Sequence, residues 1–321
     1  MKIVGIVPHW NRSDLLRSLL GNLAQQTRPF DEIIVIDNGS TDDSVAFARS
    51  AGVTVLELGR NTGFAGGVNC GIENTDAEWV AILNNDVLLD ENWLNILEPQ
   101  MADADFLTGK LLSAANTALI DGTFDELAAS ACACRCGAGA KDSPDWNQAE
   151  PIHFAPMTAA LFRRSLFTEI GGLDETFESY LEDVDFGLRC AVAGKRGVYV
   201  PEARGVHQGS ATTGAWHLNT VRLIARNQIL LSVKHFRGQP LWPRLAGQLL
   251  WGLVALRHGR LDSWLLGKWQ GWRARHTVLR FDHPKLLLTG ILELSEQRIF
   301  DIQRRTGFDL YWRLYFWLRG R

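Results

Sequence analysis

Residues 32–42, EIIVIDNGSTD, place a run of strand-forming apolar residues directly before a polar turn and the start of a helical pattern. The same order of apolar run and helical pattern recurs on both sides of this stretch, at residues 2–7 and 13–26, 53–58 and 64–73, and then 79–83. Strands and helices that alternate at this pitch predict a parallel sheet with helices on both faces. Ligand sites in such a sheet gather at the carboxyl ends of the strands, which are here Pro8, Asp37, Gly59 and Asn84.

The composition is that of a folded enzyme and excludes a disordered or fibrous chain. Of 321 residues, 46% are hydrophobic and 21% charged, and this length predicts one large domain with an appendage. The first apolar run ends at Pro8 and is too short for a signal peptide or a spanning helix, so export is not expected. Cys132, Cys134 and Cys136 have a one-residue spacing unlike that of common zinc sites. Reduced cytoplasmic thiols are the favoured interpretation, with a local metal or redox site as the alternative, and we assign the three no role.

The regular alternation ends after residue 103. Residues 128–139 and 141–150 are typical of a long loop, and from Trp216 onward only helices are predicted. The two parts also differ in charge: residues 1–221 hold 15 Lys and Arg against 30 Asp and Glu, whereas residues 222–321 hold 18 against 6. A basic segment of this size indicates an anionic partner, such as a membrane surface, a phosphorylated substrate or nucleic acid.

Four polar clusters fall where such a fold would place a site. Residues 37–42 (DNGSTD) and 61–69 (NTGFAGGVN) each open a predicted helix, and the glycines of the second would let the backbone approach a phosphate. An ordinary turn with a helix cap also explains the first, and the second lacks the common nucleotide-binding spacings. Residues 83–86 (LNND) end a strand in a carboxylate beside amides, which suits Mg²⁺ or Mn²⁺, with a solvated turn as the alternative. Residues 171–185 contain GGLDE and EDVD; carboxylates this close need protons, a metal or basic partners, although an acidic helix start explains some of them.

Taken in this order, the clusters resemble the donor and catalytic motifs of family 2 of the inverting glycosyltransferases, most closely its rhamnosyltransferase-like branch. The resemblance spans about residues 2–236 and includes Asn11 and His207. It implies an α/β fold of the GT-A type, a Rossmann-like mostly parallel sheet with helices on both faces, followed here by a helical C-terminal extension. The catalytic domain would cover residues 1–215, with a nucleotide-sugar half over about 1–110 and an acceptor half over about 111–215. The extension would cover residues 216–321.

The resemblance implies the roles of the donor-side residues. Asp37 would contact the base or ribose of a nucleoside diphosphate, and Asn61 and Asn69 would line its pocket. The other residues expected to bind the nucleotide sugar are Pro8, Asn11, Gly63, Asn84 and Asn85. Asp86 would bind a divalent metal, Mg²⁺ or Mn²⁺, between the two phosphates, and His207, within GVHQGS (205–210), matches a further metal ligand. Asn84 departs from the family, which often has an acidic residue there, so weaker metal binding is expected.

The family's reaction moves a sugar from a diphosphate leaving group to a hydroxyl with inversion. It needs one general base and one Lewis acid. Asp183 matches the family's base, and Glu182 and Asp185 would be acidic neighbours that raise its pKa, orient it or bind the acceptor. The segment 154–164 (FAPMTAALFRR) lies where relatives have an acceptor-side strand, but it has Pro and Thr in place of the usual Gly.

Other enzyme classes fit less well. A sugar-nucleotide pyrophosphorylase needs a glycine-rich basic signature after the first strand, and a nicotinamide dehydrogenase needs Gly-x-Gly-x-x-Gly there, whereas this chain has PHWNR at 8–12. A non-catalytic nucleotide-sugar-binding or membrane scaffold is the alternative from another class, but it would be expected to lack Asp86, Asp183 or His207. The expected donor is dTDP-rhamnose, with UDP-hexoses and UDP-N-acetylhexosamines as the alternatives.

The basic residues 222–321 interleave Arg and Lys with seven tryptophans: Trp242, Trp251, Trp264, Trp269, Trp272, Trp312 and Trp317. Helices with Trp and Leu on one face and Arg on the other lie in a membrane interface, and residues 310–321 (LYWRLYFWLRGR) are the clearest example. The alternative is that the tryptophans pack the extension onto the acidic catalytic domain. The membrane interpretation predicts a cytoplasmic enzyme bound peripherally at the inner face of the plasma membrane, with a polyprenyl-diphosphate-linked glycan as acceptor. No nucleic-acid-binding motif accompanies the charge.

Overall fold

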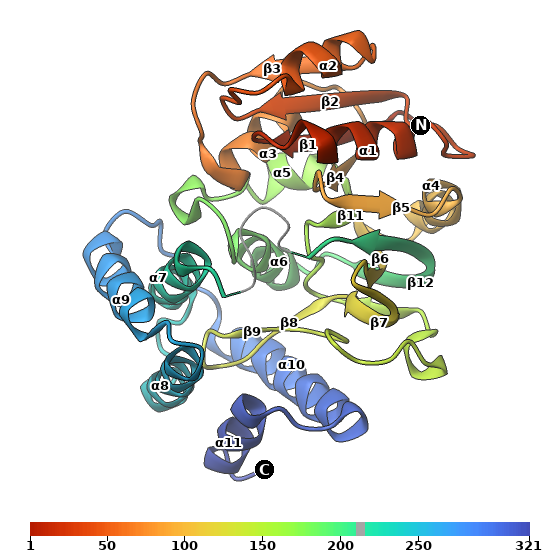
Figure 1. Cartoon of the computed structure of the whole chain (residues 1–321). Coiled ribbons are helices and arrows are strands. Elements are labelled where there is room, and N and C mark those ends of the chain that lie inside the picture. Colours follow the sequence, from red (N-terminus) through yellow and green to blue (C-terminus); the bar gives the residue numbers. More distant parts are fainter. Residues whose placement is uncertain (210–215) are drawn as a thin grey trace.

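The computed structural model describes residues 1–209 and 216–321 of the chain. A ten-stranded sheet runs through the molecule in the order β10-β12-β6-β11-β4-β1-β2-β3, with β5 paired to β12 and β7 to β6 (Figure 1). Its strands are β1 (Ile3–His9), β2 (Glu32–Asp37), β3 (Thr54–Glu57), β4 (Trp79–Leu83), β5 (Val87–Leu89), β6 (Phe106–Ser113), β7 (Asn116–Gly122), β10 (Glu150–Ile152), β11 (Ala159–Arg163) and β12 (Gly197–His207). The first four strands along the chain pair in parallel, as predicted, while β11 runs antiparallel to both β4 and β6.

Helices cover both faces of this sheet because each strand alternates its side chains between the two faces. Ile3 and Val7 of β1 belong to a core with the leucines of α1, whereas Val4 and Ile6 belong to a second core with Val68 of α3. The helices of the catalytic part are α1 (Ser13–Leu23), α2 (Ser44–Ser50), α3 (Gly63–Glu73), α4 (Trp93–Leu97), α5 (Ser165–Glu169) and α6 (Glu182–Val192). Short 3₁₀ turns are η1 (Glu98–Ala102), η2 (Pro144–Trp146) and η3 (Glu175–Phe177).

The glycine-rich stretch of α3 lets this helix approach the sheet closely. A Cβ atom at Gly71 would lie 2.6 Å from Ile6 and 2.9 Å from Ile36, and one at Gly67 would lie 3.0 Å from Asn38. Packing of α3 against β1 and β2 therefore accounts for part of a pattern that the sequence connected with phosphate binding.

The region predicted as a long loop forms a small sheet instead. β8 (Asp125–Leu127) and β9 (Ala133–Arg135) pair antiparallel, and β10 adds an edge strand to the main sheet. All five cysteines are free thiols, and Cys134 is buried among Tyr311, Tyr315 and Phe316. The small Ala and Cys residues of this hairpin give no clear apolar alternation, so its strands could not be recognised from hydrophobic pattern.

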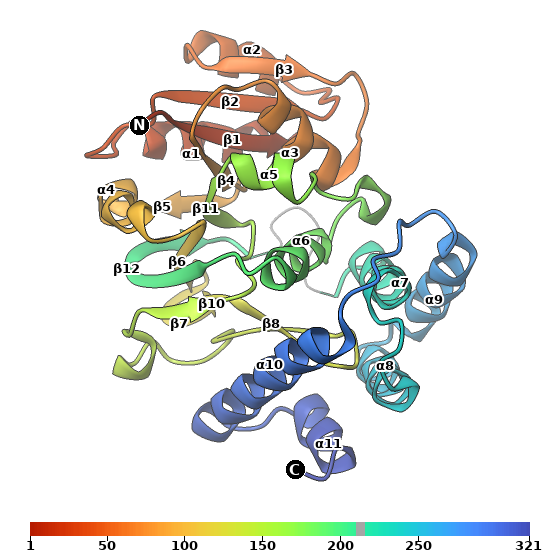
Figure 2. The same ribbon diagram turned by 180° about the vertical axis from the view of Figure 1, so that it is seen from behind.

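Residues 216–321 are helical, as predicted. The helices are α7 (Leu218–His235), α8 (Leu241–Arg257), α9 (Leu261–Ala274), α10 (Lys285–Thr306) and α11 (Leu310–Leu318). Figures 1 and 2 show α10 and α11 below β8 and β9, at the end of the molecule opposite α2 and β3, with α7, α8 and α9 beside them. The expected domain boundary at residue 215 and Ser210 of the His207 motif lie outside the described residues.

The extension is packed firmly on the catalytic part. Leu230 of α7 and Leu292 of α10 share a core with Phe177 and Leu188, and Ala129 donates a 3.0 Å backbone hydrogen bond to the buried Glu296. No helix within the described residues has the length and apolar content that a bilayer crossing needs.

The expectation for residues 310–321 is wrong in part. Tyr311, Trp312, Tyr315 and Phe316 are buried against the β8–β9 hairpin and α10, because the aromatic face of α11 fills a core there. Trp317, by contrast, is 72% exposed.

Candidate active site

The carboxyl ends of β1 and β2 form a compact polar turn. Asp37 is buried opposite His9, and its carboxylate accepts hydrogen bonds of 3.1 Å from the backbone N–H groups of Gly39 and Ser40. Asn11, in the left-handed conformation with φ 53°, accepts a 2.9 Å bond from Thr41 N–H. Asp37 and Asn11 thus stabilise the same turn. This turn lies at the carboxyl ends of β1 and β2, the edge where parallel sheets bind ligands.

A second unit joins this turn to the start of α3. The side-chain oxygen of Asn38 accepts hydrogen bonds from the backbone and the hydroxyl of Thr62, and that of Asn61 accepts one of 2.9 Å from Gly63 N–H. Gly63 has φ 79° and lies so close to Glu178 that a Cβ would fall 2.5 Å from its carbonyl oxygen. The sequence did not single out Asn38, although its position after a strand end was a signal for it.

Asn69 is predicted to line the nucleotide pocket, but both its amide oxygen and its amide nitrogen form hydrogen bonds with a neighbouring loop. Its oxygen accepts a 2.8 Å bond from Leu173 N–H, and its nitrogen donates to Leu173 O at 2.9 Å and to Glu175 at 3.1 Å. A Cβ on Gly172 would lie 2.8 Å from the Asn69 oxygen. These contacts hold the GGLDE turn against α3.

The predicted metal ligands meet where β12 ends beside the start of β5. Val87 and His207 are register partners, and His207 Nε2 lies 3.2 Å from an Asp86 carboxylate oxygen. The other ring nitrogen lies 2.8 Å from Asp121, and both Asp86 and His207 are 7% exposed. Burial lowers the pKa of His207, but its bonds to Asp121 and Asp86 outweigh this and raise the pKa to about 9.

Asp121 on β7 was missed from the sequence because it lies in the irregular region beyond the fourth strand. A carboxylate on one nitrogen of a metal-binding imidazole fixes the ring and aims the other nitrogen at the ion. Asp121 holds His207 in this way, so that Nε2 faces Asp86.

The remaining residues predicted at this edge lie around His9. The side-chain amide of Asn85 lies 3.0 Å from His9 Nδ1, and His9 Nε2 lies 2.8 Å from the Ser44 hydroxyl. Asn84 N–H donates to Thr158 O on the approach to β11, and Pro8 pairs in register with Ile36.

The predicted base, Asp183, is half-buried in the first turn of α6. Burial raises its pKa, while the Arg135 guanidinium and N–H groups of Val184 and Met157 lower it. Burial and the Asp183 charge raise the pKa of the neighbouring Glu182 well above its usual range.

Arg135 of β9 lies between the acidic residues at the start of α6 and Asp121, the partner of the proposed metal ligand His207. Its guanidinium lies 3.7 Å from Asp121 and 3.6 Å from Asp125. Burial raises the pKa of Asp125 to about 7, Arg135 opposes the rise and the Asp183 charge adds to it. Arg135 and Asp125 are further residues that the sequence did not indicate, because their hairpin was taken for a loop.

The segment before Asp183 has an unusual backbone. Glu178, Tyr180 and Leu181 have φ of 62°, 71° and 69°, a conformation that side chains other than Gly and Asn disfavour. The buried Asn227 of α7 donates through its amide to the carbonyl groups of Phe177, Ser179 and Tyr180 at 2.7–2.9 Å.

Asp185, predicted to bind the acceptor or orient the base, is fully buried, and its hydrogen bonds go to other residues. Its carboxylate contacts Arg189 at 2.9 Å, Lys234 at 2.9 Å and His235 at 2.7 Å, and these bonds hold its pKa below the usual range despite burial. None of these contacts reaches Asp183. Asp185 ties α6 to α7.

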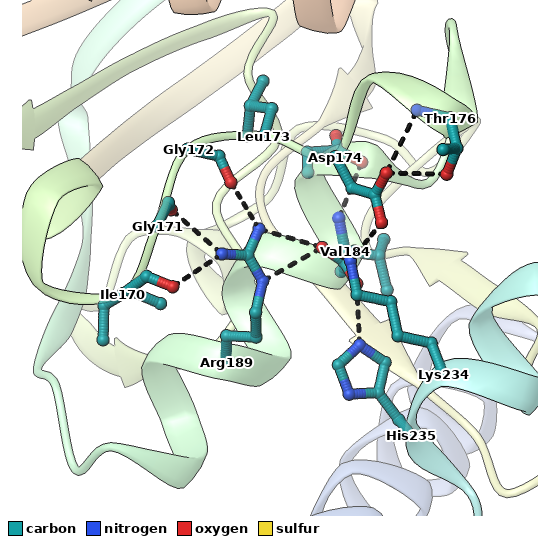
Figure 3. Close-up of polar contacts among 12 residues, drawn as sticks. Ile170, Gly171, Gly172, Leu173, Asp174, Thr176, Val184, Arg189, Lys234 and His235 are labelled. Atoms are coloured by element: carbon teal, nitrogen blue, oxygen red, sulfur yellow. Dashed lines mark hydrogen bonds and ion pairs between the residues drawn. The ribbon is translucent and has the colours of Figure 1, made fainter. Parts of the chain in front are cut away.

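Arg189 and Lys234 extend this group to the GGLDE turn. Figure 3 shows the Arg189 guanidinium donating to the carbonyl groups of Ile170, Gly171 and Gly172, at 2.9–3.0 Å. Lys234 also contacts Asp174 at 2.6 Å. The two acidic motifs that the sequence joined in one cluster are therefore held together by buried cations.

Comparison with known proteins identifies the family. The model of "Glycosyl transferase family 2" matches residues 6–118, and that of "Glycosyl transferase family group 2" matches residues 79–295, more than half of the chain. The chain belongs to glycosyltransferase family 2. The N-acetylglucosaminyl-diphospho-decaprenol L-rhamnosyltransferase of Mycobacterium tuberculosis is 30% identical to this glycosyltransferase over 228 residues, 62% of this chain and 73% of the relative. The O-antigen biosynthesis protein RfbC of Myxococcus xanthus is 28% identical over 67% of this chain but only 18% of its own length.

Solved structures confirm the fold of this glycosyltransferase. GalNAc-T7 with UDP, GalNAc and Mn²⁺ superposes with a TM-score of 0.63 at 14% identity, over 96% of this chain and 58% of that one. The mannosyltransferase PcManGT of Pyrobaculum calidifontis with GDP-Man and Mn²⁺ gives 0.54 at 16% identity, over 98% of this chain and 85% of that one. The expected α/β GT-A-type fold with a helical C-terminal region and the expected rhamnosyltransferase-like branch of the family are confirmed.

The residues of this glycosyltransferase fit a divalent metal. The buried carboxylate of Asp86 is a hard oxygen donor and the oriented imidazole of His207 is a borderline nitrogen donor, and both suit Mn²⁺. A bound metal would replace the proton on Nε2 of His207. Within residues 1–209 and 216–321, no group of three or more His, Cys, Asp or Glu side chains is arranged to hold a metal ion. The remaining ligands would have to come from substrate phosphates and water.

Proposed function

We propose that this glycosyltransferase moves L-rhamnose from dTDP-rhamnose to a hydroxyl of a polyprenyl-diphosphate-linked glycan acceptor, with inversion. The observation that carries the proposed metal-assisted chemistry is the Asp86–His207 pair, with its ring held by Asp121 at the carboxyl edge of the sheet. The similarity to a rhamnosyltransferase that is named for a diphospho-decaprenol acceptor supports the choice of sugar and acceptor.

In this mechanism the donor-side residues hold the nucleotide sugar. Asp37 and Asn11 set the turn that faces the base and ribose, and Pro8, Asn61, Gly63, Asn69, Asn84 and Asn85 shape the surrounding pocket. Asp86 and His207 would hold Mn²⁺ or Mg²⁺, which when bound neutralises the charge that develops on the departing diphosphate.

On the opposite side, Asp183 removes the proton from the acceptor hydroxyl as it attacks the sugar. Burial raises the pKa of this carboxylate, and the Arg135 guanidinium opposes that rise. Burial and the Asp183 charge raise the pKa of the neighbouring Glu182, which disfavours a second negative charge beside the base. The Asp185 group supports the helix that presents Asp183 rather than touching the acceptor.

We further propose that the extension docks this enzyme on the cytoplasmic face of the plasma membrane. One face of α8 exposes Trp242, Leu245, Leu249, Leu253 and Leu256, each 46–61% accessible. Exposed apolar stripes of this length mark interaction surfaces, and the excess of Arg and Lys around them suits anionic lipid. A membrane surface would also supply a lipid-linked glycan for cell-envelope polysaccharide biosynthesis.

The donor can be tested without an acceptor. The enzyme is incubated with dTDP-rhamnose, UDP-glucose, UDP-N-acetylglucosamine and GDP-mannose, with and without Mn²⁺, and released nucleoside diphosphate is measured. The proposal expects slow, Mn²⁺-dependent hydrolysis of dTDP-rhamnose above the others. Faster hydrolysis of a UDP-sugar would replace rhamnose with the alternative donor. Hydrolysis of none would contradict a catalytic role and favour a binding scaffold.

A further inference from the structure

A hollow of about 400 Å³ opens between α7 and α9, beside the segment that leads to Asp183. It is lined chiefly by Glu178, Arg222, Arg226, Trp269, Gln270 and Arg273. Its volume is in the range of small-ligand sites. None of its residues belongs to the donor site described above.

Two glycines of α9 create this arrangement. A Cβ at Gly267 would lie 2.2 Å from Arg222 O, and one at Gly271 would lie 2.5 Å from Arg226 O, so the two helices touch through their backbones. Arg222 and Arg226 are four residues apart and share one face of α7. The close contact therefore places them beside the end of α9 that carries Arg273.

Positive charge in the hollow exceeds negative charge. Arg226 contacts Glu178 at 3.3 Å, and Glu178 is the one acidic side chain among the described residues that line the hollow. Arg222 donates to the neutral oxygens of Asn219 and Gln270, and in the described part of the chain no carboxylate lies within 4.0 Å of Arg222 or Arg273. Burial and the Arg222 charge act together to lower the pKa of Arg226. Arginines left in excess in this way attract an anion, and their planar groups suit phosphate oxygens.

The surface next to the arginines is apolar. Leu265, Leu266, Trp269 and Trp272 of α9 are 45–59% exposed, and the Arg273 guanidinium stacks 4.8 Å above the Trp269 ring. A ligand that matches both features has an anionic head and a hydrocarbon tail. A free phosphate or a soluble sugar would leave the apolar face uncovered.

We propose that this hollow binds the diphosphate of a prenyl-linked acceptor, with the prenyl chain along the exposed face of α9. The inference rests on the proposed function for the lipid-linked acceptor and adds where its charged group is held. Glu178 is five residues before Asp183, so a diphosphate bound here would place the attached glycan near the start of α6, which carries the proposed base.

The test uses the full chain and farnesyl diphosphate, below its aggregation concentration, as the probe. Calorimetry is done with the donor site filled by dTDP and Mn²⁺, on the wild type, Arg222→Gln, Arg273→Gln and the double variant. Arg313→Gln on α11, which removes the same charge elsewhere on the extension, is the matched control. We expect about fivefold weaker binding for each single variant, about twentyfold for the double variant and no change for Arg313→Gln. Equal affinity in the wild type and the double variant, or no binding by the wild type, would overturn the proposal.

Two further probes separate the sources of phosphate. Inorganic pyrophosphate should bind at least about tenfold more weakly than farnesyl diphosphate, because it lacks the apolar chain; equal affinity would overturn the prenyl part of the proposal. If the arginine variants lose binding to phosphatidylglycerol vesicles but not to farnesyl diphosphate, the hollow is a lipid head-group site and the proposal is wrong. Melting temperatures of the variants confirm folding.

The two proposals fail in different ways. A wild-type enzyme that hydrolyses no nucleotide sugar, yet binds farnesyl diphosphate through these arginines, would contradict the transferase function and support the prenyl-diphosphate site. Hydrolysis of dTDP-rhamnose together with arginine-independent binding of farnesyl diphosphate would support the transferase function and contradict the prenyl-diphosphate site.

Discussion

His235 Nε2 lies 2.7 Å from the Asp185 carboxylate, and this buried hydrogen bond links the first helix of the extension to the helix that presents Asp183. The pKa of His235 is lowered by burial, so its ring is neutral and donates through Nε2. Its other nitrogen lies 2.7 Å from His283 Nε2, in the segment before α10. The position of the α6 helix therefore depends on residues about 50 and 100 positions further along the chain.

The histidine pair makes stability depend on pH. Burial and the neighbouring His235 lower the pKa of His283 to about 4, against the opposing charges of Asp185 and Asp282. Between about pH 6.5 and pH 4 the unfolded chain binds a proton at this position and the folded chain does not, so stability falls as the pH falls through this window. His283→Gln removes the titration.

We therefore expect the melting temperature to fall more between pH 7 and pH 5 in the wild type than in His283→Gln, by about 2–4 °C. Differential scanning calorimetry at both pH values measures this difference. An equal fall in both proteins would show that His283 does not contribute.

Asn227 holds the strained segment before the base, and its loss should affect turnover more than donor binding. Asn227→Ala removes the amide that donates to the carbonyl groups of Phe177, Ser179 and Tyr180, which should cost about 1–3 kcal/mol of stability. We expect kcat to fall by about tenfold because Asp183 is displaced, with the donor KM unchanged. Gln297→Ala, an exposed amide on α10, is the control. A changed donor KM with normal kcat would place Asn227 on the nucleotide side instead.

The orienting role of Asp121 can be separated from metal ligation. Asp86→Asn removes a proposed ligand and should reduce turnover by about a hundredfold or more, even at high Mn²⁺. Asp121→Asn keeps both ligands but loosens the His207 ring, and it should raise the Mn²⁺ concentration for half-maximal activity by about 10–100-fold. Titration of activity with Mn²⁺ distinguishes the two. Full activity of Asp86→Asn in EDTA would exclude the proposed metal site.

The membrane proposal is tested on the exposed face of α8. Leu249→Ser with Leu253→Ser should reduce flotation with phosphatidylglycerol vesicles by about tenfold, and binding by the wild type should weaken as salt is raised. Phosphatidylcholine vesicles are the control for charge. Point variants are preferable to a chain that ends near Gly238, because such a chain would lose Leu288, Ile291 and Leu292 from the core around α6. No binding by the wild type would favour a soluble acceptor.

The sequence was sufficient for the parallel half of the fold and for much of the site. Strands β1 to β4 and helices α1 to α3 have strong local signals, and the turn at Asp37 follows from where a strand ends. The family resemblance implied a metal site at Asp86 and His207, and the structure places these two side chains 3.2 Å apart. Asp121 and Arg135 could not be predicted, because they come from antiparallel hairpins of small residues with weak alternation. The partners of Asp185 could not be predicted from the sequence either, because Lys234 and His235 come close to Asp185 only through tertiary packing.

The burial of one face of α11 against protein also could not be predicted from the sequence. An amphipathic pattern of Trp, Tyr and Arg predicts that one face leaves water but not whether lipid or protein covers it. In α11 protein covers Trp312 and Tyr315, whereas Trp317 stays exposed.

The most direct test of the proposed reaction is transfer of rhamnose by the wild type and by Asp183→Asn. Purified enzyme is given dTDP-rhamnose, Mn²⁺ and prenyl-diphosphate-linked N-acetylglucosamine, and the lipid-linked product and the donor Kd are measured in parallel. Asp183→Asn should bind the donor as the wild type does, while product formation falls by about a thousandfold or more, because the change removes a proton acceptor and almost no volume. Transfer by Asp183→Asn within tenfold of the wild type, or an equal loss of donor binding, would contradict the assignment of Asp183 as the base.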